Sequence, residues 1–209
     1  MKSPLLPENV HLIEKHSKNK NSKTILIVGV FHGEEPQGEY VIKRYLREND
    51  SSKLNNNLIL IPCLNPWGKE RGIRTNKNGV DLNRNHPTKN WKLTEKDENY
   101  SGDSPGSELE TMFMTELLDI IKPDIILTLH APLKCINFDG PAREIAEKIA
   151  ELCNYPVIED LGYLTPGSFG TYCGIERNIP TITLEYDKKE ADESIYNKTK
   201  MVFDYLAKL

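Results

Sequence analysis

Four short, largely apolar segments restrict the fold of this chain more than any other feature of its sequence. They are rich in β-branched residues and far too short to cross a membrane. Strands that are apolar on both faces are typical of parallel sheets with a layer of helices on each side. We therefore expect four buried strands, at residues 25–30 (ILIVGV), 58–62 (LILIP), 124–130 (DIILTLH) and 181–186 (TITLEY).

Amphipathic patterns of helical period separate these strands. They predict helices over residues 37–47, 107–121, 141–152 and 194–209. Because strands and helices alternate along the chain, the sequence predicts an α/β fold with a mostly parallel sheet. A length of 209 residues suits one well-packed domain, so we interpret residues 1–209 as a single domain.

The composition argues against two classes of partner. A net charge of −4 with 28% charged residues lacks the basic excess that nucleic-acid binding favours, and no apolar run has the length of a bilayer span. The first 23 residues contain prolines and charges but no secretory apolar region, and the four cysteines include no C-x-x-C pair. We expect buried, reduced thiols and a cytoplasmic protein that binds neither nucleic acid nor membrane.

A long polar segment interrupts the alternation. Residues 65–103 are rich in Gly, Asn, Arg and Pro, and their hydrophobic periodicity is weak. A connection of this length inside a compact domain is usually functional or disordered. The ordered-looking part, NPWGKERGIRTNKNGVDLNRNHP, favours a functional loop.

Residues with metal-binding side chains follow two of the predicted strands. His32 and Glu35 come directly after the first strand, and His130 ends the third. Ligands of open α/β sheets gather at the carboxyl ends of the strands, and two histidines with one carboxylate form a catalytic zinc site that keeps a position for water. The alternative is that the histidines are hydrogen-bonded strand-end residues without a metal. Glu185 ends the fourth strand and is placed to act as a general base, or else it is a solvated carboxylate.

Several motifs occur together in one order: HGEEPQGEY, PCLNPWGKERGIRTNKNGVDLNRNHP, LTLH and TLEY. With them the chain resembles the M14 zinc carboxypeptidase family over nearly its whole length. This resemblance implies a three-layer α/β/α fold with a mixed, mostly parallel sheet, and a single zinc ion. It makes His32, Glu35 and His130 the zinc ligands and Glu185 the base.

The same resemblance assigns roles in the long loop. Arg71 and Arg74 match an R-x-x-R motif, in which Arg74 stabilises the oxyanion of the scissile carbonyl. Asn83 and Arg84 match the pair that binds the terminal carboxylate of a small peptide substrate. Planar guanidinium groups suit both tasks, although arginines in a polar loop can also be merely solvated.

A narrower resemblance is carried by NWK, SGDSPGSELET, HAPLKCI and GYLTPGSFGTYC. These segments look like the murein peptide amidases, which cleave the bond between γ-D-glutamate and meso-diaminopimelate in recycled cell-wall peptides. By that resemblance Phe169 and Ser168 lie at the side-chain pocket, and Tyr163 is the candidate for a mobile tyrosine that donates to the leaving amine. Two positions depart from the pattern. His86 replaces an aromatic residue, either as a packing residue in its place or as a fourth metal-seeking side chain, and Ala131 replaces an acidic residue.

Other functions fit part of the same sequence. A cytoplasmic metallocarboxypeptidase for ordinary peptides and a deacylase of N-acyl amino acids would both use the metal motif. A carboxylate-binding module without turnover would tolerate the loss of a ligand or of the base, yet His32, Glu35, His130 and Glu185 are all present. We therefore expect a hydrolase, with the murein peptide as its substrate.

Overall fold

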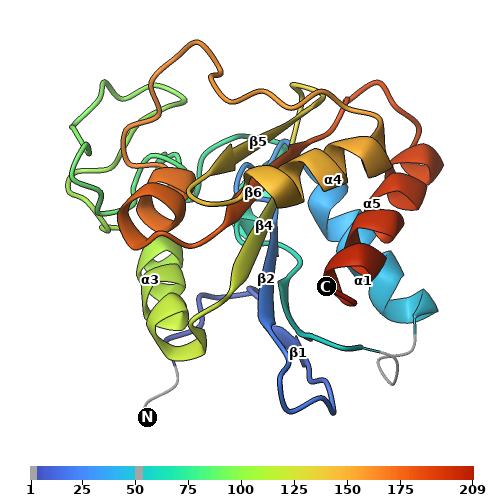
Figure 1. Cartoon of the computed structure of the whole chain (residues 1–209). Coiled ribbons are helices and arrows are strands. Elements are labelled where there is room, and N and C mark those ends of the chain that lie inside the picture. Colours follow the sequence, from blue (N-terminus) through green and yellow to red (C-terminus); the bar gives the residue numbers. More distant parts are fainter. Residues whose placement is uncertain (1–3, 50–53) are drawn as a thin grey trace.

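The structure, a computed structural model, describes residues 4–49 and 54–209. A six-stranded mixed sheet lies at its centre, with strand order β1-β3-β2-β4-β6-β5 (Figure 1). The four inner strands run parallel, whereas β1 and β5 pair antiparallel at the two edges. The strands are β1 (Ile13–Lys15), β2 (Thr24–Gly29), β3 (Asn57–Ile61), β4 (Ile125–His130), β5 (Cys135–Asp139) and β6 (Thr181–Glu185).

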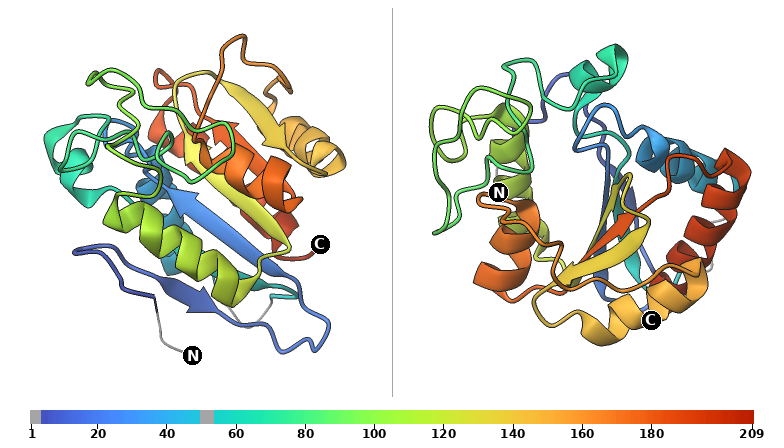
Figure 2. Two further views of the ribbon diagram at one scale, coloured as in Figure 1. Left: turned by 90° about the vertical axis from the view of Figure 1, so that its left-hand side faces the viewer. Right: turned by 90° about the horizontal axis from the view of Figure 1, so that it is seen from above.

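Two layers of helices cover the sheet. Helices α1 (Gln37–Glu48), α4 (Arg143–Cys153) and α5 (Asp192–Leu206) lie on one face. Helix α3 (Leu109–Ile121) and a short π-helical turn at Thr171–Ile175 lie on the other, as the view along the sheet in Figure 2 shows. A separate apolar core forms on each face, with the inner strands buried between them. This is the expected three-layer α/β/α architecture.

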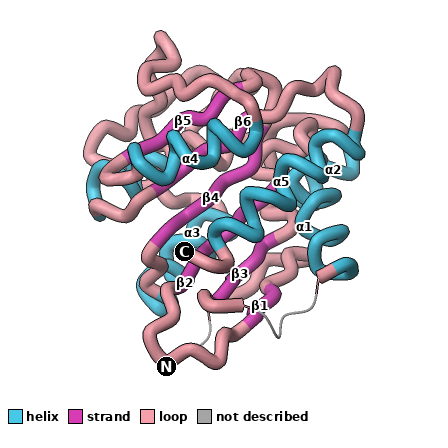
Figure 3. Tube along the Cα trace, turned by 45° about the vertical axis from the view of Figure 1, so that its right-hand side comes forward, coloured by secondary structure: helices cyan, strands magenta, loops and turns pink. Residues whose placement is uncertain are grey.

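The predicted strands and helices are confirmed with small changes in their bounds. Each of the four apolar segments forms a strand within one residue of the prediction, and Figure 3 shows these strands side by side in the sheet. Helix α3 begins two residues later than predicted, and α5 ends three residues earlier. The sequence did not reveal β1, β5 or the short helix α2 (Pro66–Arg71). The two edge strands are partly exposed and mix polar with apolar residues, so they lack the mostly apolar sequence of the inner strands.

Local capping explains why a helix forms inside the polar loop. Asn65 precedes α2 and its side chain accepts a hydrogen bond from the backbone N–H of Gly68 at 2.9 Å, while Pro66 occupies the first helical position. Gly72 ends the helix with a positive φ of 63°, which favours glycine. The capped helix holds the loop that follows it against the carboxyl ends of the central strands.

The four cysteines agree with the expectation of buried, reduced thiols. Cys63, Cys135, Cys153 and Cys173 are all free and buried. Burial raises the pKa of the Cys63 thiol to about 12, so this group stays protonated at neutral pH. In the described ranges no helix has both the length and the apolar character needed to cross a bilayer.

Candidate metal centre and active site

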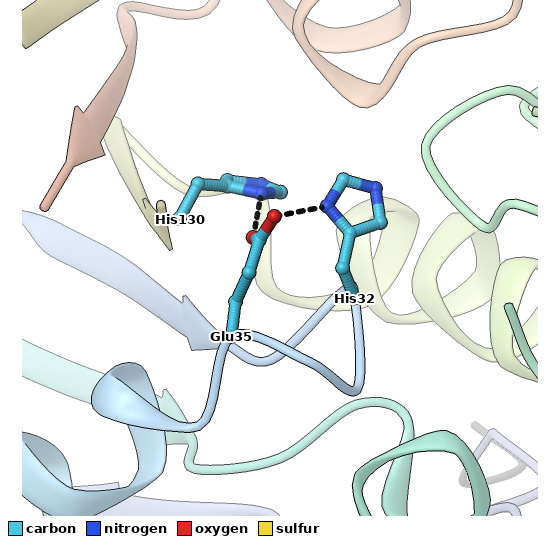
Figure 4. A group of neighbouring side chains, drawn as sticks. All are labelled: His32, Glu35 and His130. Atoms are coloured by element: carbon cyan, nitrogen blue, oxygen red, sulfur yellow. Dashed lines mark hydrogen bonds and ion pairs between the residues drawn. The ribbon is translucent and has the colours of Figure 1, made fainter. Parts of the chain in front are cut away.

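The three predicted metal ligands converge at one point. Figure 4 shows the carboxylate of Glu35 between the two imidazole rings, with 3.0 Å from Oε1 to Nδ1 of His32 and 3.0 Å from Oε2 to Nδ1 of His130. All three side chains are buried, and their donor atoms lie within 4.8 Å of one another. Two imidazole nitrogens and one carboxylate oxygen are the donor set of catalytic zinc sites, so these residues fit the ion.

The turn after β2 brings the first two ligands together. The backbone N–H of Glu35 donates to the carbonyl of His32 at 3.1 Å, which closes a tight turn and points both side chains the same way. Gly33, between them, packs against α2 so closely that a Cβ atom there would lie 2.0 Å from the carbonyl carbon of Gly68. Its N–H also donates to the carbonyl of Arg74 at 3.3 Å. Glycine at this position therefore lets the ligand turn contact the arginine loop.

Strand register places His130 beside Glu185. These two residues are paired at the carboxyl ends of the adjacent parallel strands β4 and β6. The Glu185 carboxylate is 9% exposed and accepts a hydrogen bond from the backbone N–H of Leu133 at 3.4 Å. Burial raises the pKa of Glu185, and the nearby carboxylate of Glu35 acts in the same direction. A carboxylate with a raised pKa beside the three metal-binding side chains is well suited to accept and return a proton.

Asp81 connects the metal ligands to the arginine loop. One oxygen of this fully buried carboxylate lies 3.1 Å from Nε2 of His32 and accepts from the backbone N–H of Asn83 at 2.8 Å. The other accepts from Nε and Nη2 of Arg74 at 3.0 and 2.8 Å. Burial lowers the pKa of His32, but Asp81 and Glu35 outweigh it and raise that pKa to about 9. Asp81 thus orients a ligand and an arginine at once.

No sequence pattern indicated a role for Asp81. The residue lies in the segment GVDLNRN, two positions before Asn83, but its contact with His32 spans 49 positions of the chain. A carboxylate that binds the outer nitrogen of a ligating histidine fixes the ring orientation and the tautomer and raises ligand basicity. The only sequence signal was the proximity of an aspartate to the Asn-Arg motif.

We expect Asp81→Asn to weaken zinc binding about 10- to 100-fold, because an amide cannot supply the negative charge that makes the His32 imidazole a better ligand. Competition with a chromophoric chelator measures this affinity directly. Glu34→Gln is the matched control, since it removes one negative charge from an exposed position in the same ligand turn. Equal zinc affinity in Asp81→Asn and the wild type would refute the positioning role.

A cavity of about 260 Å³ opens at the cluster and collects nearly all of the predicted site residues. Arg71 is the exception. Those that line the cavity are His32, Glu35, Arg74, Asn83, Arg84, His130, Tyr163, Ser168, Phe169 and Glu185.

The arginines and Asn83 give part of the cavity wall an affinity for anions. Arg84 is 8% exposed, and its pKa is lowered by burial and by the positive charge of Arg74. The side-chain oxygen of Asn83 accepts from the backbone N–H of Phe169 at 2.9 Å, which leaves its amide hydrogens as donors. The positive charge of the half-buried Arg74 acts on the buried Arg84, so Arg84 gains most from an anion bound beside it.

The structure does not bring Arg71 into the cavity, although the residue matches the R-x-x-R motif. Arg71 is the last residue of α2, and its guanidinium lies 4.2 Å from the centre of the Trp67 ring. Nη1 donates to the carbonyl of Trp67 at 3.1 Å and to the Glu70 carboxylate at 2.7 Å. Its side chain is 45% exposed. The helix turns Arg71 toward solvent, whereas Arg74, three residues later, has left the helix and reaches Asp81.

Tyr163, Ser168 and Phe169 reach the cavity from one segment between α4 and β6. Phe169 is 1% exposed and Ser168 is 6% exposed, and the Ser168 hydroxyl accepts from the backbone N–H of Thr171 at 3.1 Å. Tyr163 is 53% exposed, so its ring lies at the rim rather than in the interior. Ala131 is buried beside His130 and also lines the cavity. The structure is therefore compatible with a tyrosine that closes over a substrate.

His86 fills the place of an aromatic residue, as the sequence predicts. Its ring centre lies 5.0 Å from that of Phe169 and 5.4 Å from that of Tyr172, and the side chain is fully buried. Within the described part of the chain, neither ring nitrogen has a hydrogen-bond partner. Burial, assisted by the charge of Arg177, lowers the pKa of His86 to about 3. His86 is a neutral packing residue behind the cavity and is not one of the converging metal ligands.

The buried His86 should make the protein sensitive to acid. The unfolded chain binds a proton at this residue below about pH 6.5 while the folded protein does not, so stability falls as pH drops from there toward 3. Between pH 7 and pH 5 the expected loss is roughly 2 kcal/mol. His86→Phe should remove this part of the pH dependence, as denaturant unfolding of the metal-free proteins will measure. His11→Phe, at an exposed histidine, is the control, and parallel stability curves for wild type and His86→Phe would contradict the prediction.

Comparisons with known proteins agree with this geometry. The family model described as zinc carboxypeptidase, Peptidase_M14, matches residues 8–151. Murein peptide amidase A of Escherichia coli K12 is 36% identical over 181 residues, covering 81% of this chain and 73% of that protein. The protein of the same name from Vibrio campbellii is 33% identical over 190 residues, covering 84% and 73%.

Solved structures give the same result for the fold. The murein-tripeptide amidase MpaA of Escherichia coli O157 superimposes with a TM-score of 0.78 at 31% identity, covering 92% of this chain and 83% of that one. Carboxypeptidase A of Helicoverpa armigera has a TM-score of 0.75 at 15% identity, covering 95% and 68%, a likeness of fold alone. The chain is a hydrolytic enzyme and belongs to the M14 zinc carboxypeptidase family, in the branch of the murein peptide amidases.

Proposed function

We propose that this enzyme is a zinc-dependent amidase that cleaves the bond between γ-D-glutamate and meso-diaminopimelate in murein peptides. The observation that carries the proposal is the single cavity in which the His-Glu-His cluster, Glu185 and two arginines meet. The names of the relatives support the choice of substrate. The proposal includes action in the cytoplasm on recycled cell-wall peptides, and one catalytic domain spanning residues 1–209.

His32, Glu35 and His130 would hold one zinc ion. When bound at such a site, zinc lowers the pKa of water to about 7 and polarises a carbonyl group. The donor set supports this assignment, because three buried donor atoms converge from two strand ends and leave the cavity side open. Asp81 would keep the His32 ring in its ligating orientation.

The remaining groups of the chain divide the work of amide hydrolysis. Glu185 takes a proton from the attacking water and returns it to the leaving amine. Arg74, held by Asp81, presents its guanidinium to the oxygen on which negative charge develops. Tyr163, at the rim, donates a hydrogen bond to the leaving amine when its loop closes over the substrate.

Arg84 and Asn83 position the substrate by its free terminal carboxylate. The guanidinium supplies paired donors, and the Asn83 amide hydrogens remain available because its oxygen already accepts from Phe169. A carboxylate held here presents the preceding bond to Glu185 and Arg74. The buried setting favours a small peptide over a long chain, because the cavity of about 260 Å³ is partly enclosed by the loop that carries Tyr163.

A hydrolysis assay with synthetic L-Ala-γ-D-Glu-meso-diaminopimelate tests the proposal. We expect release of free diaminopimelate, detected by mass spectrometry, and its loss in the presence of a metal chelator. An otherwise identical tripeptide with an α-linked L-glutamate and an N-acetyl amino acid serve as competing substrates. Preferential cleavage of the α-linked peptide would replace the murein assignment by that of an ordinary metallocarboxypeptidase, and preference for the N-acetyl amino acid would replace it by that of a deacylase.

A further inference from the structure

Asp139 lies in the cavity without a charged partner. It is the last residue of the edge strand β5 and lines the same cavity as the His-Glu-His ligand cluster and Glu185. The other two acidic residues of the outer wall are already engaged: Glu159 pairs with Arg143 at 2.6 Å, and Asp160 accepts from the backbone N–H of Gly162 at 2.8 Å. Among residues 4–49 and 54–209, no ion pair or hydrogen bond involves the Asp139 carboxylate.

Two glycines make room for this carboxylate. A Cβ atom on Gly170 would lie 2.1 Å from Oδ2 of Asp139, and one on Gly174 would lie 2.3 Å from its Cβ. Gly170 directly follows Phe169, the predicted pocket residue, so Asp139 faces the segment that forms the side-chain pocket. Any larger residue at Gly170 or Gly174 would displace Asp139. The burial that results raises the pKa of Asp139, so a bound cation would relieve an uncompensated carboxylate.

The strand register gives the spacing along the sheet between Asp139 and Glu185, which acts at the reacting bond. β5 and β6 pair antiparallel, with Cys135 opposite Glu185, Asn137 opposite Thr183, and Asp139 opposite Thr181. Asp139 is thus four residues along the strand from the level of Glu185, which is roughly 13 Å at about 3.3 Å per residue. Asn137 and Thr183 line the cavity between these two levels.

The C-terminal residue of the proposed substrate spans that distance. From the scissile amide nitrogen to the side-chain nitrogen of diaminopimelate there are six bonds, and an extended zigzag of six bonds of about 1.5 Å covers roughly 7.5 Å. Hydrogen-bond contacts of about 3 Å at each end bring the total to roughly 13.5 Å, close to the spacing given by the register. A side-chain ammonium would therefore arrive at Asp139 while the amide lies at Glu185.

We propose that Asp139 selects the substrate by binding the ammonium group at the end of the C-terminal residue's side chain. This inference rests on the proposed function for the position of the scissile bond. It deepens that function, because it accounts for a preference for a diamino acid through one charge-assisted hydrogen bond to a half-buried carboxylate. Lysine carries an ammonium at the same number of bonds from its amide nitrogen, so Asp139 should accept lysine and reject its uncharged counterpart norleucine.

Three peptides of the form L-Ala-γ-D-Glu-X test the role of Asp139, with meso-diaminopimelate, L-lysine or L-norleucine as X. For the wild type, kcat/KM for the lysine peptide should exceed that for the norleucine peptide by about 10- to 100-fold. In Asp139→Asn this preference should disappear, since cleavage of the two ammonium-bearing peptides falls by that factor while cleavage of the norleucine peptide is unchanged. Asp119→Asn, an exposed residue of α3, should retain the wild-type preference.

A binding measurement supports the test without turnover. Calorimetry on Glu185→Gln and on the double variant Glu185→Gln/Asp139→Asn should show the same loss of preference for the lysine peptide. The role of Asp139 would be overturned if Asp139→Asn kept the wild-type ratio of kcat/KM between the lysine and norleucine peptides. It would also be overturned if the wild type showed no preference for the lysine peptide. The proposed function fails separately, if α-linked peptides are preferred over γ-linked ones, and the lysine-to-norleucine comparison within the α-linked series still decides the role of Asp139.

Discussion

Replacing Glu185 by glutamine should lower kcat by about 10²–10⁴-fold while the enzyme keeps its zinc. Glutamine has nearly the same shape but cannot accept a proton from water, and Glu185 is not one of the three converging ligands. The measurements are the rate of diaminopimelate release and the zinc content of the purified variant. Glu144→Gln, on the exposed side of α4, is a control with the same chemical change.

The pH dependence of the wild type gives a second readout for the same group. Burial raises the pKa of Glu185 above its ordinary value of 4.5. A base acts only in its ionised form, so kcat/KM should fall as pH drops through this raised pKa, at a higher pH than for a solvated glutamate. A Glu185→Gln variant that retains full turnover would show that another group serves as the base.

Removing the metal should abolish turnover, and adding zinc should restore it in the wild type. The family and the His32, Glu35 and His130 cluster both point to zinc. In Glu35→Gln the same zinc addition should restore little activity, because the carboxylate between the two imidazoles is lost. The loss of a direct ligand should weaken zinc binding by more than the roughly 10- to 100-fold that is typical of losing an outer partner.

Thermal unfolding checks this prediction independently of activity. A metal that binds only the folded protein raises Tm, so a chelator should lower the Tm of the wild type and leave that of Glu35→Gln nearly unchanged. Restoration of Glu35→Gln activity at the zinc concentration that suffices for the wild type would exclude Glu35 as a ligand.

Local sequence patterns predicted the inner framework well and the sheet edges poorly. The strands β2, β3, β4 and β6 are largely apolar because most of their residues are buried on both faces, and that burial leaves a direct trace in the sequence. The edge strand β5 is partly exposed and mixes polar with apolar residues, so it carries no such trace. Sheet order is non-local as well, since β2 pairs with β4, which begins almost a hundred residues later.

The candidate site shows the same division. Sequence motifs identified His32, Glu35 and Glu185. His32 and Glu35 share one tight turn after β2, and Glu185 ends the apolar strand β6, so local sequence is enough to place each of them. The same motifs also included Arg71, which the end of α2 turns toward solvent. Spacing along a chain cannot distinguish an arginine inside a helix from one just beyond it when both match a pattern.

The amino-acid sequence by itself determined the α/β class, the strand ends and the types of side chain that meet there. Tertiary structure alone decided how those groups act on one another. Asp81 acquires its role by reaching His32 and Arg74 at once, and Asp139 acquires its role through antiparallel pairing with β6 and the space left by Gly170. Both roles depend on burial and on distances between segments far apart in the chain. These quantities exist only after folding, because hydrophobic burial removes water from the carboxylates and makes each remaining contact strong.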